Sequence, residues 1–370
     1  MTISVLGVQP RYFIRPKNTD WRHNIFLEES FAERNIIHDA QVKFTLRRSL
    51  ESFVSMNFRH LRGKLGSIPI AGQNLKKKDY FIKLFSSDSI AKYDVIYSYG
   101  CYPVGTDKPV VWHTGPTDVE LLSKRGVSSD DIKREIDSKA VSASNSKLIS
   151  VSSETGLIAF DQQFPGYREK IIVLPFIIPN IIEIDNSEIL EKHSQESLNI
   201  VFVGREAKRK GLDLVLGAYA QLISNSKRKI TLTIVSDFSG GHIDIPSSLN
   251  VVWHRSLDHS GVQKLMRSAH ILVMPSREES YGLVYLEAMA AGAVPIAPNR
   301  EPQISLLDGG NCGSLCELTV EGVFDALERL VSNDQLRSTL ALNGINKYKA
   351  FFSKDSVMTC YERAFIRAAN

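Results

Sequence analysis

The chain has 370 residues, 43% of them hydrophobic and 23% charged, and its formal net charge is +4. At roughly 150 residues per domain, this length predicts two domains, each with a sizeable core. The composition excludes collagen-like, low-complexity and mostly disordered proteins. Four scattered cysteines do not make a disulfide framework, and the longest uncharged apolar stretch, Ile171–Ile182, is too short to span a membrane. Because the N-terminus also lacks a signal-peptide pattern, we expect a cytoplasmic protein.

The first half alternates apolar strands with polar helical stretches. It opens with a buried strand at Ile3–Val8 and a helix around Ile25–Arg34. Further strands are predicted at Asp94–Tyr97, Val110–His113, Leu148–Val151 and Ile171–Leu174, and helices at Asp118–Lys124 and Asp130–Ser142. Strands that alternate with helices indicate a parallel sheet that is covered on both faces.

Positive charge is concentrated in the segment 41–85, which contains ten lysines and arginines but only two acidic residues. Such a patch attracts anionic lipid, phosphorylated glycan or nucleic acid. Within it, residues 43–65 predict a basic amphipathic helix, which can lie on an anionic membrane surface. An ordinary core-facing helix with a solvated basic face has the same periodicity, so both interpretations stay open. The modest net charge and the lack of interleaved aromatic residues argue against a nucleic-acid partner.

The second half repeats the same alternation. Strands are predicted at Asn199–Val203, Thr231–Val235, Val251–Trp253, Ile271–Met274 and Val294–Ala297, and helices at Leu212–Ile223, Gly261–Ser268, Leu283–Ala291 and Val357–Ala369. The polar segment Ile182–Ser197 is the expected boundary between two doubly wound α/β domains, 1–185 and 186–355, with a final helix at 356–370. Two such domains would leave an interdomain cleft at the carboxyl ends of their strands, where a ligand is expected.

Two segments of the second half carry residues suited to binding. In Val201–Gly211 a strand ends at Gly204, and Arg205 and Lys210 follow in a loop before a helix, an arrangement that favours a phosphate group. In Met274–Gly292 a polar loop leads through Gly282 into a helix, with Glu279 in the loop and Glu287 eight residues on. These two carboxylates have no cation directly beside them in the sequence, so they are suited to accept hydrogen bonds from the hydroxyl groups of a sugar or a ribose. Taken singly, a solvated basic turn and a solvated acidic face explain the two segments equally well.

Together and in this order, the two segments resemble the retaining, nucleotide-sugar-dependent glycosyltransferases of the GT-B fold (glycosyl transferases group 1, family 4-like). The resemblance is carried by strand–Gly204–Arg205–x4–Lys210–Gly211 and by Ser276–Arg277–x–Glu279–x7–Glu287–Ala–Met–Ala–x–Gly292. It implies two facing Rossmann-like domains, an N-terminal one for the acceptor and a C-terminal one for the donor. It also implies a nucleoside-diphosphate sugar as donor substrate, with no metal ion and no other cofactor.

The resemblance also assigns roles to individual residues. Arg205 and Lys210 would hold the donor diphosphate, Glu279 the sugar hydroxyls and Glu287 the ribose. The donor contacts would be completed by backbone groups at Gly204, Tyr281, Gly282, Leu283 and Gly7. His113, at a strand end in the first half, would contact the donor sugar or polarise an acceptor hydroxyl; the alternative is a buried histidine with satisfied hydrogen bonds. The family's glycine-rich loop after the first strand is missing, since only Gly7 is present there.

The function predicted on this basis is metal-independent transfer of a hexose-like sugar to a hydroxyl of a cell-surface glycan or a lipid-linked precursor, in polysaccharide biosynthesis. The final helix would cross back to the first domain, and the protein would be cytoplasmic or peripheral on the inner face of the membrane. Two alternatives stay open: a non-catalytic GT-B subunit that binds a partner or membrane, and a nucleotide-sugar epimerase on the same fold.

Overall fold

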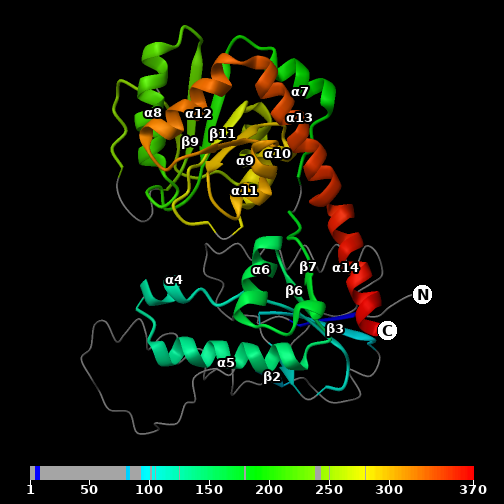
Figure 1. Cartoon of the computed structure of the whole chain (residues 1–370). Coiled ribbons are helices and arrows are strands. Elements are labelled where there is room, and N and C mark those ends of the chain that lie inside the picture. Colours follow the sequence, from blue (N-terminus) through cyan, green and yellow to red (C-terminus); the bar gives the residue numbers. More distant parts are fainter. Residues whose placement is uncertain are drawn as a thin grey trace. The chain divides into compact units, whose positions relative to one another are not determined.

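The computed structural model divides the chain into two compact units, a first unit of residues 1–175 and 358–370 and a second unit of residues 176–357 (Figure 1). It describes residues 93–100, 102–104, 106–124, 126–178, 181–237, 243–249, 251–279 and 281–370, together with the backbone of 5–8 and 81–83. The helix predicted around Ile25–Arg34 and most of the basic segment 41–85, with the helix predicted at 43–65, lie outside the described residues.

The first unit is built on a parallel five-stranded sheet in the order β1-β3-β5-β6-β7. Its strands are β1 (Val5–Val8), β3 (Val95–Tyr99), β5 (Val110–His113), β6 (Leu148–Val151) and β7 (Ile171–Val173). A second, two-stranded parallel sheet pairs β2 (Phe81–Lys83) with β4 (Tyr102–Val104). The helices are α4 (Val119–Lys124), α5 (Ser129–Asn145), α6 (Glu154–Gln163) and the short η1 (Arg168–Lys170).

The core of the first unit is aromatic and includes residues from the end of the chain. Trp112 on β5 is almost fully buried, and its ring meets Phe160 of α6 edge to face, with the centroids 6.4 Å apart. From Met358 onward, helix α14 (Lys354–Ala369) belongs to this unit. Its Tyr361 and Phe365 lie edge-on to Tyr97 of β3 at 5.6 and 5.8 Å.

The second unit is built on a parallel six-stranded sheet in the order β10-β9-β8-β11-β12-β13. Its strands are β8 (Leu198–Val203), β9 (Ile230–Val235), β10 (Val252–His254), β11 (Ile271–Val273), β12 (Val294–Pro298) and β13 (Ser314–Cys316). Its helices are α7 (Asn186–His193), α8 (Leu212–Asn225), α9 (His259–Ser268), α10 (Leu283–Ala290), α11 (Gln303–Leu306), η2 (Asp308–Gly310), α12 (Val320–Ser332) and α13 (Asp334–Phe351). On one side of this sheet α8 packs against α12 (Figure 1).

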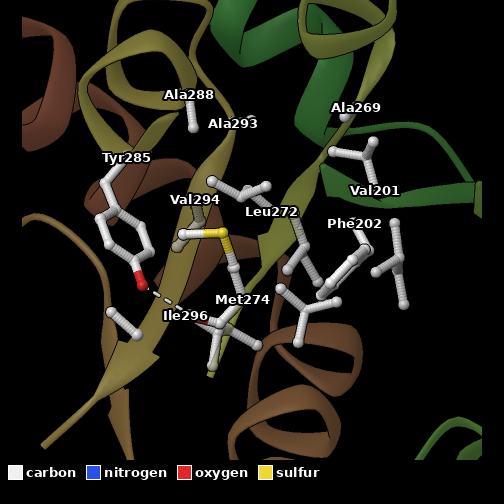
Figure 2. Packing of buried hydrophobic residues seen from close by; sticks show 14 of the residues in the cluster. Val201, Phe202, Ala269, Leu272, Met274, Tyr285, Ala288, Ala293, Val294 and Ile296 are labelled. Atoms are coloured by element: carbon white, nitrogen blue, oxygen red, sulfur yellow. Dashed lines mark hydrogen bonds between the residues drawn. The ribbon is translucent and has the colours of Figure 1, made fainter. Parts of the chain in front are cut away.

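The central strands of the second unit are buried on both faces, as continuous apolar runs predict for a parallel sheet. Figure 2 shows Phe202, Leu272 and Ile296 from neighbouring strands among the packed side chains of this core. Tyr285 brings a hydroxyl into the same core and donates a hydrogen bond of 2.7 Å to the carbonyl of Met274 (Figure 2). That bond satisfies the polar end of a fully buried side chain and fixes α10 to the end of β11.

The alternation of strands and helices predicted for both halves is confirmed, and with it the α/β fold of two Rossmann-like sheets. The segment Ile182–Ser197, expected to be a boundary linker, instead contains α7 and lies in the second unit, which begins at Phe176. Asp185 caps α7 by accepting a hydrogen bond from the backbone of Glu188, and Ile189 is fully buried. The segment is acidic and polar in sequence, yet it forms a helix because it carries both a cap and a buried face. Within the described residues, no helix is long and apolar enough to cross a membrane.

Two buried histidines fix α7 and β8 in the second unit. His193 Nε2 donates to the carbonyl of Gly292 at 2.9 Å, and its Nδ1 accepts from Arg337 Nε at 3.1 Å. His270 accepts from the backbone N–H of Asn199 at 3.0 Å and donates to the carbonyl of Lys192 at 2.9 Å. Each ring uses one nitrogen as an acceptor, so only the neutral form fits. Burial lowers the pKa of His193 to about 3 and that of His270 to about 4.

We therefore predict that acid destabilises the second unit. Below pH 6.5 the unfolded chain binds protons that these two rings cannot accept, so the free energy of unfolding falls as the pH drops towards 4. Each histidine contributes a slope of about 1.4 kcal/mol per pH unit. Hydrogen exchange of the β8 amides, corrected for intrinsic rates, measures this slope, and His270→Asn should remove about half of it. An opening free energy in β8 that does not change between pH 6.5 and 4.5 contradicts the prediction.

Candidate functional site

The candidate site in the second unit consists of two loops that follow neighbouring parallel strands. The first site loop, residues 204–211, connects β8 to α8, and the second site loop, residues 274–282, connects β11 to α10. Because β8 and β11 are paired and parallel, both loops leave the same edge of the sheet. This is the edge at which the sequence places a ligand.

A glycine brings the two loops into direct contact. Gly211 has a left-handed φ of 80°, and a Cβ placed on it would lie 2.2 Å from the carbonyl oxygen of Pro275. At Gly282 φ is 93°, and a Cβ would lie 2.4 Å from the ring of Tyr285. Only glycine fits either position, because a side chain would be strained by the backbone angle and would also collide.

Both glycines also leave a helix start without a side-chain cap. Gly211 and Gly282 are the N-cap residues of α8 and α10, and neither helix has a side-chain hydrogen bond at its cap. By contrast, α5, α6, α7, α9, α12 and α13 are each capped by a Ser, Asp, Thr or Asn side chain. Uncapped backbone N–H groups and the positive end of the helix dipole favour an anion.

Charged side chains join the two loops. Lys210 Nζ of the first loop forms an ion pair with Glu279 Oε2 of the second, and each side chain is only 13% exposed. Arg209 donates to the carbonyl of Glu278 at 2.7 Å. Arg277 in turn makes a two-point ion pair with Asp213 in the first turn of α8, at 2.7 and 2.8 Å. Burial raises the pKa of Asp213, but the hydrogen bonds from Arg277 outweigh it and leave the pKa below its ordinary value.

The two cations that the sequence predicts at one phosphate site, Arg205 and Lys210, pair with different carboxylates in the structure. Lys210 packs its stem over Gly204, where a Cβ would come within 3.0 Å of Lys210 Cγ, and its amine turns to Glu279. Arg205 is about half exposed and pairs with Asp237 at the end of β9, Nε to Oδ2, at 3.1 Å. Arg209 is also paired, with Glu206 at 2.7 Å, so Arg205, Arg209 and Lys210 each have a carboxylate partner.

Three further predicted residues lie around these loops. Glu287 is on α10, 16% exposed, with Oε1 3.9 Å from Nδ1 of His259. Tyr281 is buried, its ring edge-on to Phe176 at 4.9 Å, and burial raises the pKa of its hydroxyl. Leu283 begins α10 and is partly buried. Among the described residues, no group of three or more His, Cys, Asp or Glu side chains is arranged to hold a metal ion.

His113 and Gly7 belong to the first unit and are described within it. His113 ends β5 and is 3% exposed, with Nδ1 3.1 Å from Ser150 Oγ and Nε2 3.2 Å from Ser152 Oγ. Its ring stacks on Tyr99 with the centroids 5.0 Å apart. Both nitrogens therefore have hydrogen-bond partners, as the alternative of a satisfied histidine expects. The backbone of Gly7 lies in β1, opposite Tyr97 of β3.

Sequence reasoning missed the partners of the site's cations. Asp213, Asp237 and the two serines beside His113 were not singled out. Asp213 occupies the first turn of a predicted helix, where an acidic residue is common because it complements the helix dipole. That signal does not distinguish an ordinary first-turn acid from one that binds an arginine of another loop.

Comparison with known proteins bears on both units. The solved structure of HepE from Anabaena in complex with UDP resembles the chain with a TM-score of 0.65 at 15% identity, covering 98% of this chain and 100% of that one. This likeness shows the fold: two Rossmann-like domains of the GT-B type. Residues 185–347 match the family described as glycosyl transferases group 1. The match covers the greater part of the second unit and lies outside the first.

The curated relatives match mainly part of the chain. An uncharacterized 41.2 kDa protein in the cps region of Klebsiella pneumoniae is 30% identical over 147 residues, which are 38% of this chain and 40% of the relative. The phosphatidyl-myo-inositol mannosyltransferase of Mycobacterium tuberculosis is 26% identical over 206 residues, 50% of this chain and 53% of the relative. The chain thus spans about half the length of the curated relatives it matches.

The close approach of the two loops predicts a large cost for Gly211→Ala. Gly309 is a matched control, because its φ of 62° is also left-handed but a Cβ there would meet nothing within 4 Å. Gly309→Ala should lower the free energy of unfolding by about 1–2 kcal/mol, the cost of a left-handed alanine. Gly211→Ala should cost about 1–3 kcal/mol more, since the Pro275 carbonyl must move. Urea unfolding measures both, and equal costs would show that the loops do not touch as described.

Proposed function

We propose that the protein is a retaining, metal-independent glycosyltransferase that moves a sugar from a nucleoside-diphosphate sugar to a hydroxyl of a cell-surface glycan or a lipid-linked glycan precursor. The observation that carries the proposal is the contact of the two site loops. A lysine suited to phosphate lies against a carboxylate suited to sugar hydroxyls, between two helix starts that lack side-chain caps. The match of residues 185–347 to the family described as glycosyl transferases group 1 supports the same activity.

The donor roles follow from the chemistry of the side chains. Breaking the anomeric C–O bond leaves the electron pair on the departing diphosphate, and Lys210, Arg205 and the starts of α8 and α10 would stabilise that charge. We assign the sugar hydroxyls to Glu279 and the ribose to Glu287. The backbone at Gly204, Tyr281, Gly282 and Leu283 would lie against sugar and phosphate. The acceptor oxygen would bond to the anomeric carbon on the face that the diphosphate leaves, and its proton would pass to the diphosphate.

We assign acceptor binding to the first unit. We keep His113 as the candidate group that contacts the sugar or the acceptor hydroxyl. For this its Nε2 must exchange the Ser152 hydroxyl for a substrate hydroxyl, since both ring nitrogens already have partners. Gly7, at the end of the first strand, would allow close approach of the backbone to the donor. A cytoplasmic site of action, peripheral on the inner face of the membrane, and an anionic surface bound by the segment 41–85 belong to the same proposal.

The relatives indicate the class of acceptor. The mycobacterial relative is by name a mannosyltransferase acting on phosphatidyl-myo-inositol, and the Klebsiella relative is encoded in a cps region. We therefore place this protein in polysaccharide or glycolipid biosynthesis. UDP is the nucleotide in the HepE complex, and it is the first diphosphate to try.

The function is tested by binding followed by transfer. A panel of UDP, GDP, ADP, CDP and dTDP should yield one diphosphate that binds, and the corresponding labelled nucleotide sugars should label a glycan or lipid fraction. Transfer should persist in EDTA, and the new linkage should keep the anomeric configuration of the donor. Lys210→Ala should lower kcat/KM about 100- to 1000-fold, the range measured for loss of one preorganised donor to a developing anion. The proposal is contradicted if none of the diphosphates binds, or if the chelator abolishes sugar transfer.

The ion pair of Lys210 with Glu279 predicts two opposite effects of removing a carboxylate. Glu279→Gln frees Lys210 from its counter-ion, so the affinity for the free nucleoside diphosphate should rise several-fold while sugar transfer falls. Glu287→Gln, the same change on α10, should weaken binding of the nucleoside diphosphate, because the ribose hydroxyls then meet one neutral acceptor oxygen in place of the two of a carboxylate. Isothermal titration measures both dissociation constants. If both variants weaken binding equally, Glu279 does not compete for Lys210.

A further inference from the structure

Arg277 of the second site loop makes more hydrogen bonds to the first loop and to α8 than the Lys210–Glu279 ion pair provides. The Arg277 guanidinium donates to both carboxylate oxygens of Asp213 and also to the carbonyl of Lys208. The backbone N–H of Arg277 donates to the carbonyl of Arg209 at 2.8 Å. One residue of the second loop thus contacts the first loop at two carbonyls and the following helix at a carboxylate. Planar, two-point arginine–carboxylate pairs hold both distance and orientation.

These contacts already occupy the Arg277 guanidinium. Its guanidinium is engaged by three protein oxygens, and to bind a diphosphate it would have to leave Asp213. The Asp213 carboxylate would then stand alone in the first turn of α8, next to the charge of the diphosphate. The two negative charges would repel each other. Replacing Asp213 by phosphate as the partner of Arg277 would therefore gain little free energy.

Under the proposed function, this contact would still join the loops when a donor is bound. The second site loop is joined to the first by Lys210 with Glu279 and by Arg209 with the Glu278 carbonyl, and to α8 by Arg277 with Asp213. A diphosphate that takes Lys210 opens the first of these links. The link through Arg277 and Asp213 involves neither proposed donor contact, so it can remain closed while the donor is bound.

We propose that Asp213 and Arg277 are a positioning pair for the donor: together they set the separation between Lys210, which holds the diphosphate, and Glu279, which holds the sugar. The inference rests on the proposed function and adds two residues that act through others. Losing either partner releases the second site loop from the first. The diphosphate and the sugar are then no longer held in register for bond breaking.

The chain offers a matched control for this pair. Arg228 and Asp334 form another two-point arginine–aspartate pair in the second unit, with NH2 to Oδ2 at 3.0 Å. Arg228 precedes β9, at the amino end of the sheet, opposite the edge that bears the site loops. Arg228→Ala removes the same kind of two-point ion pair, together with hydrogen bonds to three backbone carbonyls, but it should not disturb the donor.

The experiment compares Arg277→Ala, Asp213→Ala, their double variant and Arg228→Ala in the full chain, using the nucleotide sugar selected by the panel. We expect each single variant of the positioning pair to lower kcat/KM at least tenfold, mainly through kcat. The double variant should be no worse than Arg277→Ala, because the two residues act as one. Arg277→Lys should recover part of the rate. Arg228→Ala should lower Tm but leave kcat and KM within twofold of the wild type.

Two results overturn the inference and leave the proposed function standing. If Asp213→Ala raises the affinity for the nucleoside diphosphate while Arg277→Ala lowers it, Arg277 itself binds phosphate and Asp213 competes for it. If Arg277→Ala lowers Tm with kcat and KM unchanged, as in Arg228→Ala, the pair only stabilises the fold. A wild-type protein that binds no nucleoside diphosphate overturns the proposed function and this inference with it.

Discussion

The contact between Gly211 and Pro275 is the constraint on which the site depends. Parallel strands β8 and β11 deliver two loops to one edge of the sheet, and the lack of a side chain at Gly211 lets their backbones meet. Once the backbones are this close, charged side chains from the two loops come within reach of one another. The ion pairs between the loops follow from that approach.

Four cations of the two site loops are paired with carboxylates. Lys210, Arg205, Arg209 and Arg277 each have a carboxylate partner, because a partly buried cation without one would be costly. An anionic ligand therefore exchanges partners instead of meeting free cations. Under the proposed function, such an exchange would make the site selective, since only a ligand that binds both the released Glu279 carboxylate and Lys210 would compensate for the lost ion pair. A nucleoside diphosphate that carries a sugar has both kinds of group.

The sequence predicts those features that depend on local pattern. The strands Val110–His113 and Leu148–Val151 are observed at the predicted residues, because continuous apolar runs between polar segments are typical of buried parallel strands. The position of Lys210 and Glu279 at two loops of one edge also follows from motif order. The local sequence pattern does not predict features that depend on residues far along the chain. Helix α7 is one such feature, because its sequence is polar. The pairing of Asp213 with Arg277 is another, because these residues are 64 positions apart.

The most direct test of this account is a crystal structure of the protein with the nucleoside diphosphate that it binds. The account predicts that Lys210 Nζ has moved from Glu279 to a phosphate oxygen, that the phosphates lie at the starts of α8 and α10, and that Arg277 still holds both oxygens of Asp213. A diphosphate bound away from these two loops, or one held by Arg277 with Asp213 released, would contradict it.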